Sequence, residues 1–206
     1  MRLTLASAIL SSIIVALAMV SGARSAEIPA AALHYRADLT REAKFIFGLN
    51  APIPTLAAQI EQESGWRPGI TAWDNGRGLA QFMDGTAAWA ADRFADLGPA
   101  DPYNPRWAMR AMVRLDDFNA RKVAGIDLCH RWGAGLKAYN AGLGYVTRAQ
   151  KRSQEPAKWF GATELINAGQ SDKNFEYSRM YPRWIMGKRQ PKYAAWGTNI
   201  CKEIPQ

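Results

Sequence analysis

The chain of 206 residues contains only two histidines and two cysteines. Most protein zinc sites draw three or four ligands from these residue types, so the scarcity excludes most zinc sites with several such ligands, together with any scaffold held by many disulfides. Alternating runs of Val, Ile and Thr are nearly absent, and no Asn-Gly turn separates two such runs, which excludes a hairpin-rich β fold. No Gly-x-Ser-x-Gly segment occurs, so the nucleophile elbow of hydrolases is excluded as well. We expect no metal and no cofactor.

Apolar and aromatic residues, in contrast, are plentiful. Hydrophobic residues make up 48% of the chain and charged residues 21%, while aromatics reach 11% and include eight tryptophans. This composition is ordinary for a globular protein and argues against disorder. The length corresponds to one domain with short appendages.

The first 25 residues have the pattern of an export signal. Arg2 gives a positive start, residues 3–20 carry no charge, and the small residues of 21–26 suit a signal peptidase. Cleavage after Ser25 would place Ala23 at the minus-three position. The alternative is a weak, uncleaved membrane anchor, because the stretch is rich in Ala and Ser and could just span a bilayer. Either interpretation predicts an exported protein, periplasmic or secreted, that contacts a membrane only through this segment.

Export changes the interpretation of the cysteines and of the charge. In an oxidising compartment Cys129 and Cys201 form a disulfide that ties the C-terminal tail to the helix expected near residue 129. The net charge is +8, or +6 without Arg2 and Arg24. Because nucleic acid is not the expected partner outside the cytoplasm, an anionic cell-wall polymer fits this charge better.

Helix start and stop signals recur along the rest of the chain. Thr40 is a candidate cap for a first helix, Gly65 a stop for the second, and Asn104-Pro105 opens a long one. Pro182 should bend or break the last helix. The expected helices cover 40–49, 54–64, 84–97, 105–122, 129–141, a stretch from 144, and 171–186. The sequence therefore predicts an all-α fold.

The second expected helix carries an unusual carboxylate. Leu56, Ile60 and Glu63 fall on one stripe at 100° per residue, whereas Glu61 points to the opposite side, where a charge belongs. Partial burial would disfavour the ionised form of Glu63 and raise its pKa, which suits a general acid near neutral pH. The other interpretation is a carboxylate that leaves the helix end for solvent or pairs with Arg67 or Arg77.

Three motifs favour the first interpretation. Residues 63–68 read Glu-Ser-Gly-Trp-Arg-Pro, residues 78–81 read Gly-Leu-Ala-Gln, and residues 138–142 read Ala-Tyr-Asn-Ala-Gly. In this order and spacing the chain resembles the soluble lytic transglycosylase (SLT) family of the lysozyme-like superfamily. The likeness covers residues 55–146 and reaches more faintly to 181–185. There the family's final groove-lining helix carries a Tyr, matched by Tyr181, although the acid expected four residues earlier is Tyr177.

The resemblance implies a role for each matching residue. Glu63 corresponds to the single catalytic acid and base. The implied substrate-binding residues are Ser64, Gln81, Tyr139, Asn140 and Tyr181. The implied reaction cuts the β-1,4 bond between N-acetylmuramic acid and N-acetylglucosamine in peptidoglycan and leaves a 1,6-anhydro-muramic acid end. The implied fold is one lysozyme-like, goose-type domain over residues 36–206, expected to be a monomer.

Two alternatives stay open at this point. Asp74 and Asp84 are candidate second carboxylates, and either could activate water in a lysozyme-type muramidase, a setting that includes phage endolysins. Otherwise both are solvated loop acids, with Asp84 opening a helix. A non-catalytic glycan-binding wall module would retain the groove without the reaction.

Overall fold

A computed structural model describes residues 27–201 and 203–204, so the expected signal segment, residues 1–25, lies outside the described residues. Within them the α-helices are α1 (Ala30–Phe47), α2 (Ile53–Ser64), α3 (Asp84–Arg93), α4 (Pro105–Lys122), α5 (Leu128–Ala141), α6 (Leu143–Arg152) and α7 (Asp172–Arg183). A π-helical turn, η4 (Trp184–Arg189), and a 3-10 helix, η5 (Gln190–Trp196), follow α7. Three further short 3-10 segments are η1 (Gly48–Asn50), η2 (Ala95–Leu97) and η3 (Thr163–Leu165).

The all-α prediction is confirmed. In the part of the chain that the structure describes, β pairing is limited to isolated bridges between residues 71 and 82. The long helix after Asn104 begins and ends where the sequence indicates, because the Asn104 side chain accepts hydrogen bonds from the first-turn amides of Arg106 and Trp107. Gly65 ends α2 in the left-handed conformation, with φ of 59°.

The expected start of the first helix is wrong. Thr40 is no cap, because α1 begins ten residues earlier, at Ala30. Three consecutive alanines follow Pro29, and alanine is the residue with the strongest intrinsic preference for helix. The expected domain start at residue 36 therefore falls inside α1.

The third helix is also shorter than expected. It ends at Arg93 because Phe94 adopts an extended conformation, and Leu97 belongs to the separate 3-10 turn η2. The last helix continues through Pro182 and changes to π-type hydrogen bonding immediately afterwards. Pro182 therefore does not break the helix where it stands, and the regular α-helix ends one residue later, at Arg183.

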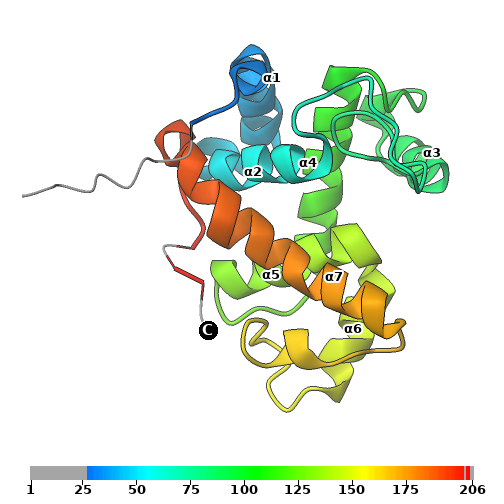
Figure 1. Ribbon diagram of the computed structural model, residues 1–206, viewed down its shortest axis with the longest axis vertical. Helices are drawn as coiled ribbons and strands as arrows, with labels where there is room; N and C mark the ends of the chain where they lie inside the picture. Colours follow the sequence, from blue (N-terminus) through cyan, green and yellow to red (C-terminus); the bar gives the residue numbers. More distant parts are fainter. Residues whose placement is uncertain (1–26, 202, 205–206) are drawn as a thin grey trace, which may run out of the picture.

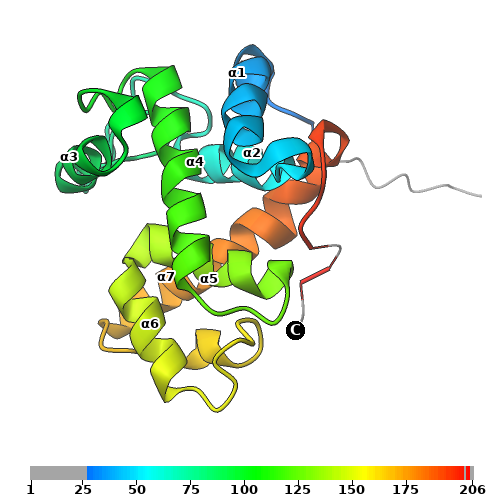
Figure 2. The ribbon, with the colours of Figure 1, turned by 180° about the vertical axis from the view of Figure 1, so that it is seen from behind.

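Figures 1 and 2 show how the helices are arranged. The long α4 runs between two ends of the molecule, with α1, α2 and α3 at one end and α5 and α6 at the other. Helix α7 crosses this arrangement diagonally and packs on α5, while η4 and η5 pack on α2. All residues of α2 from Ile53 to Ile60 are buried, so α2 is the central helix at the end of the molecule that also contains α1 and α3.

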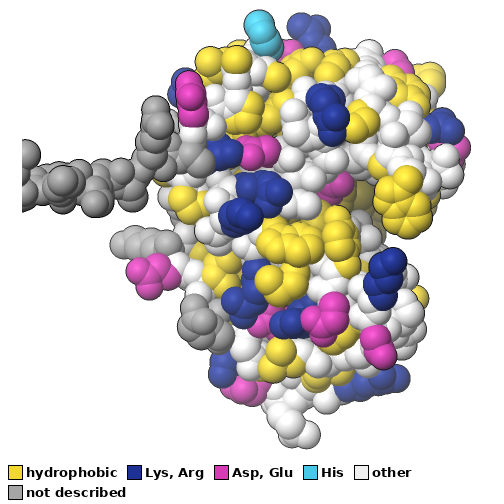
Figure 3. All heavy atoms as spheres, viewed as in Figure 1, with side chains coloured by type: hydrophobic (Ala, Val, Ile, Leu, Met, Phe, Trp, Pro, Cys, Tyr) yellow, Lys and Arg dark blue, Asp and Glu magenta, His cyan; other side chains and the backbone are white. Residues whose placement is uncertain are grey.

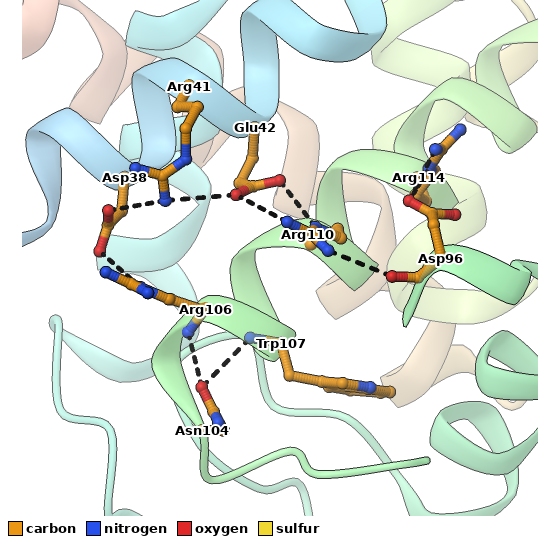
Figure 4. A network of polar contacts seen from close by, with 9 residues as sticks. All are labelled: Asp38, Arg41, Glu42, Asp96, Asn104, Arg106, Trp107, Arg110 and Arg114. Carbon is orange, nitrogen blue, oxygen red and sulfur yellow. Dashed lines mark hydrogen bonds and ion pairs between the residues drawn. The ribbon is translucent and has the colours of Figure 1, made fainter. Parts of the chain in front are cut away.

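A polar network joins α1 to the start of α4 (Figure 4). Glu42 of α1 is buried and accepts a hydrogen bond of 2.8 Å from Arg110 Nε, and Arg110 Nη1 donates to the carbonyl of Asp96 at 3.1 Å. Because the Glu42 carboxylate is buried, its pairing with Arg110 fixes the two helices relative to each other.

The C-terminal segment is tied to the helical core by the expected disulfide. The Cys129–Cys201 bond is present in the structure, with the two Cα atoms 5.0 Å apart. The carbonyl of Cys201 accepts a hydrogen bond from Gln190 Nε2 at 3.2 Å, and Gln190 Oε1 accepts one from the Thr55 hydroxyl of α2 at 2.5 Å. The tail therefore supports the helix that carries Glu63.

Candidate active site

Glu63 lies in the last turn of α2. The apolar stripe beneath it is confirmed, since the side chains of Leu56 and Ile60 have no exposed surface. Glu63 is partly buried, and the left-handed Gly65 turns the chain away just after it. The stripe therefore brings this carboxyl to the edge of the core instead of into solvent.

Tyr181 of α7 is the partner of Glu63. Its hydroxyl donates a short hydrogen bond to Glu63 Oε1, and its ring is almost completely buried. Neither of the arginines considered as partners has that role. Arg67 Nε donates to the carbonyl of Ser64 at 2.8 Å, and Arg77 pairs with Asp84.

The environment raises the pKa of Glu63 to about 7. The largest cause is burial, which disfavours the ionised carboxylate; the hydrogen bond from Tyr181 acts in the opposite direction, and the negative charge of Asp74 adds a smaller increase. Glu63 is therefore divided between its protonated and ionised forms near neutral pH, as a group that both gives and takes a proton requires.

The loop between α2 and α3 brings the second motif beside this carboxyl. Tyr139, at the end of α5, donates from its hydroxyl to the carbonyl of Ala80 at 2.7 Å. Gln81 adopts a left-handed backbone with φ of 52° and donates from Nε2 to the carbonyl of Gly78 at 2.7 Å. Burial, and then the charge of Glu63, raise the pKa of Tyr139 well above its usual range. The motifs at 63–64, 78–81 and 138–142 thus meet in one place.

Gly78 is required for that approach. Its φ is +72°, and a Cβ atom there would stand 1.9 Å from the carbonyl oxygen of Pro102. Only glycine combines a left-handed backbone with so close a contact between two loops.

The remaining predicted residues differ in exposure and in their hydrogen-bond partners. Ser64 is 1% exposed, and its hydroxyl donates to the carbonyl of Ile60 at 3.3 Å. Asn140 is exposed at the end of α5. Asp84 forms a two-contact ion pair with Arg77, of 2.6 and 2.9 Å. Asp74 is exposed in a turn, where its Oδ1 accepts from the Gly76 amide at 3.3 Å.

On the face that carries α7, hydrophobic side chains gather near the centre (Figure 3). The outline of the molecule is indented beside them, between the two ends of the fold. Tyr177 of α7 is exposed and packs edge-on against Trp184, with ring centroids 5.1 Å apart.

The family model for the transglycosylase SLT domain matches residues 48–160 of this chain. The chain belongs to the SLT family. Within the matched SLT segment lie Glu63, Ser64, Gln81, Tyr139 and Asn140, whereas Tyr181 lies beyond its end.

Solved structures show the same fold. The SLT chain is similar to an inactive mutant of the lytic transglycosylase Slt from Pseudomonas aeruginosa, with a TM-score of 0.57 and 21% identity over 82% of this chain. It is also similar to the 70 kDa soluble lytic transglycosylase from Escherichia coli, with a TM-score of 0.53 and 22% identity over 78% of this chain. The alignments span 26% and 25% of those two proteins. No curated protein matches the chain in the corresponding sequence comparison.

Two features of this region escaped the sequence interpretation. Asp116 of α4 is a second buried acid, hydrogen-bonded to Gln59 of α2 and close enough for Glu63 to influence its pKa. The sequence pattern that could have indicated a buried Asp116 is its position on the buried stripe of α4, four residues after Met112. Glu61 was expected to point to solvent, but it is largely buried and pairs with Lys192 Nζ at 2.5 Å. That partner lies far along the chain, so no local pattern could indicate it.

Trp66, Trp73 and Trp89 differ in exposure. Trp66 belongs to the core, where its Nε1 donates to the Tyr193 hydroxyl at 2.8 Å. Trp73 is 96% exposed at the tip of the turn that carries Asp74, and Trp89 is partly exposed on α3 beside Phe94.

Among residues 27–201 and 203–204, no cluster of three or more His, Cys, Asp or Glu side chains has the arrangement of a metal site. No helix within the same described ranges has the length and apolar character to cross a bilayer.

Proposed function

We propose that this SLT chain is a lytic transglycosylase that cuts the glycan strands of peptidoglycan. In this proposal it cleaves the β-1,4 bond between N-acetylmuramic acid and N-acetylglucosamine, with Glu63 as the only catalytic acid and base. Family membership supports the reaction class. The observation that carries the mechanism is Glu63 itself, a partly buried carboxyl with a pKa near 7 that is held by Tyr181.

The reaction needs one proton at two moments. The protonated Glu63 donates to the glycosidic oxygen, and the bond between that oxygen and C1 of the muramyl residue breaks. The carboxylate then takes the proton of the muramyl 6-hydroxyl, whose oxygen closes on C1 as the new bond. Glu63 ends protonated, as it began, and no water is consumed. Because the nucleophile belongs to the same sugar, its attack gains from proximity over attack by bulk water.

Tyr181 makes this double role possible. Since its hydroxyl donates to Glu63 Oε1, the proton that is transferred resides on the other oxygen, Oε2. The hydrogen bond also stabilises the carboxylate that exists between the two steps. We propose that Tyr181 fixes which oxygen faces the glycosidic bond.

The motif residues complete the site. Gln81 and Asn140 offer amide groups to the sugar, and Tyr139 holds the 78–81 loop through the carbonyl of Ala80. Ser64 supports the last turn of α2 through its bond to Ile60, and it contacts substrate only if it leaves that bond.

The proposed location of the protein follows from the location of its proposed substrate, the cell wall. Peptidoglycan lies outside the cytoplasmic membrane, which agrees with the export signal expected in residues 1–25 and with the Cys129–Cys201 disulfide. The positive net charge suits an anionic polymer. We propose a periplasmic or secreted monomer that needs no cofactor.

Muropeptide mass spectrometry tests the proposal. Residues 27–206, oxidised and folded, should release from purified peptidoglycan products that end in 1,6-anhydro-muramic acid. If folded protein binds the polymer but releases nothing, the chain is a wall-binding module and the proposal fails.

One observation favours hydrolysis as the second candidate. Asp74 is exposed and its charge influences the pKa of Glu63, so it stands on the accessible side of the site. Inverting muramidases hold a second carboxylate about 6.5–9.5 Å from the acid, where it activates a water. Products heavier by one water, with reducing ends, that disappear in Asp74→Asn would establish this candidate. Asp84 is committed to Arg77 and serves as the control.

A further inference from the structure

Asp116 is a buried acid for which the proposed reaction has no use. It belongs to the inward face of α4 and is 2% exposed. Its one hydrogen-bond donor is Gln59 Nε2, which reaches Oδ1 at 3.3 Å, while the second oxygen, Oδ2, is buried without a partner. Within the described parts of the chain no lysine or arginine forms an ion pair with it.

Such surroundings do not suit an ionised carboxylate. A buried charge needs a counter-ion or several hydrogen bonds, because it has lost its hydration, and Asp116 has one long hydrogen bond. Burial raises the pKa of Asp116 well above its usual range, the Gln59 hydrogen bond opposes this, and the charges of Glu63 and Asp117 add to the increase.

Two buried acceptors without a partner, Asp116 Oδ2 and Gln59 Oε1, motivate a proton between these side chains. Gln59 has a buried acceptor, Oε1, that also has no partner, and it belongs to the same amide that already donates to Asp116. An ionised carboxylate can only accept, whereas the acid has one O–H to donate. One proton on Oδ2 would therefore satisfy both unpartnered acceptors and close a reciprocal acid–amide pair.

We propose that Asp116 is held as the neutral acid, paired with Gln59, and that it positions the helical turn of Glu63 without placing a second negative charge beside it. Gln59 lies four residues before Glu63, so the two share one face of α2 on adjacent turns. The bearing on catalysis rests on the proposed function; the protonation state does not.

The titratable groups around the pair come from four helices. Glu63 faces it from α2, Tyr139 from α5 and Tyr181 from α7, and Asp117 is its neighbour on α4. Both tyrosines have pKa values raised well above their usual range, chiefly by burial, so they stay neutral through the working range. Among the described residues, the charges that raise the pKa of Asp116 are those of Glu63 and Asp117.

Thermal unfolding of Asp116→Asn as a function of pH tests the protonation state. An Asn–Gln pair reproduces the two hydrogen bonds of the acid–amide pair. Above the unfolded pKa of about 3.9 the unfolded parent releases the Asp116 proton that the folded parent keeps, so the parent loses this contribution to stability as the pH rises. The variant lacks this loss, and the loss that comes from Glu63 is common to both proteins. We expect the unfolding temperature of the variant, relative to the parent, to rise by at least about 3 °C between pH 4 and pH 7.

Asp117→Asn is the matched control, because Asp117 is the next residue and forms a surface ion pair with Arg121 at 2.9 Å. It should show no such rise. A relative unfolding temperature of Asp116→Asn that stays constant or falls between pH 4 and pH 7 would overturn the proposal. This measurement uses no substrate. The protonation state of Asp116 can therefore be disproved while the proposed function stands, and the proposed function can be disproved while the protonation state stands.

The positioning role has its own readout. Asp116→Ala leaves Gln59 without its partner and should lower kcat at least tenfold, whereas Asp116→Asn should keep kcat within about threefold of the parent and keep the alkaline midpoint of the pH profile. A lowered midpoint in Asp116→Asn would mean that a negative charge had been removed beside Glu63, and equal losses of kcat in both variants would mean that the pair does not position it. Either result contradicts the inference.

Discussion

At the scale of single residues, the proposed reaction depends on one carboxyl with an unusual environment. Glu63 gains its raised pKa from burial at the end of an apolar stripe, and Tyr181 moderates it with a hydrogen bond. The stripe and the burial could be predicted from the spacing of Leu56, Ile60 and Glu63. The hydrogen bond from Tyr181, which opposes the effect of burial on the pKa of Glu63, could not be predicted from local spacing. Tyr181 and Glu63 are 118 positions apart in the chain.

Replacement of the acid separates chemistry from binding. Glu63→Gln should lower glycan cleavage by about 10²–10⁴-fold, the usual contribution of a general acid or base, while sedimentation with purified peptidoglycan is retained. Glu61→Gln is the matched control on the same helix. It should keep cleavage but lower stability, because Glu61 pairs with Lys192 and Tyr193. Retained cleavage in Glu63→Gln would contradict the mechanism.

The same substitution has a consequence for stability. The folded pKa of Glu63, about 7, exceeds its ordinary value of 4.5, so the folded state holds a proton that the unfolded state releases between these values. Ionisation therefore costs stability progressively as the pH rises from 4.5 to 7. Glu63→Gln should equal the parent at pH 4 and exceed its free energy of unfolding by about 3 kcal/mol at pH 8. Urea titrations at the two pH values check this, and equal differences at both would contradict it.

Removal of the Tyr181 hydroxyl should shift the pH profile upward. The hydrogen bond lowers the pKa of Glu63, so Tyr181→Phe should raise that pKa further above 7 and move the alkaline midpoint of kcat/KM to higher pH. The maximal rate should fall, because the intermediate carboxylate loses its donor. A midpoint that moves to lower pH would show that Tyr181 acts in another way.

At the scale of elements, the helices were predictable where caps and glycines mark their ends. Asn104 and Pro105 mark the start of α4 correctly, and Gly65 marks the end of α2. The start of α1 was predicted wrongly at Thr40, because the helix preference of three consecutive alanines extends α1 back to Ala30. The 65–83 loop was recognised by its motif, but its geometry depends on a contact with the distant Pro102.

The close approach of Gly78 to Pro102 predicts the effect of a substitution at Gly78. Gly78→Ala places a Cβ 1.9 Å from the Pro102 carbonyl oxygen in a left-handed backbone, so the 78–81 loop must move away from Tyr139. We expect a loss of about 1–3 kcal/mol in stability and a large loss of cleavage. Gly69→Ala, with nothing within 4 Å of its Cβ, is the control and should leave both nearly unchanged. Circular dichroism melts and muropeptide release measure the two effects; a parent-like Gly78→Ala would refute this view of the loop.

At the scale of the whole molecule, the all-α fold and the disulfide followed from composition and export, whereas the packing of the C-terminal tail did not. In the tail, Gln190 links the backbone carbonyl of Cys201 to the Thr55 hydroxyl of α2, and no local pattern connects these residues. Lys192 and Tyr193 of the same tail bury Glu61, which is why the outward position expected for it was wrong.

The disulfide should therefore act on stability and not on chemistry. It closes a loop of 72 positions, for which the chain-entropy model gives up to about 4 kcal/mol. A double replacement, Cys129→Ser with Cys201→Ser, should lower the unfolding temperature while retaining cleavage well below it. Differential scanning calorimetry measures the first effect, and an unfolding temperature equal to that of the parent would show that the hydrogen bonds alone hold the tail.

The central claim is that one carboxyl, Glu63, cuts the glycan by closing the sugar on itself. Mass spectrometry of the muropeptides released from purified peptidoglycan by residues 27–206 tests it most directly. The parent and Asp74→Asn should release products with 1,6-anhydro-muramic acid ends, and Glu63→Gln should release none. Reducing ends, one water heavier and absent from Asp74→Asn, would contradict it and assign the reaction to a hydrolase with two carboxylates.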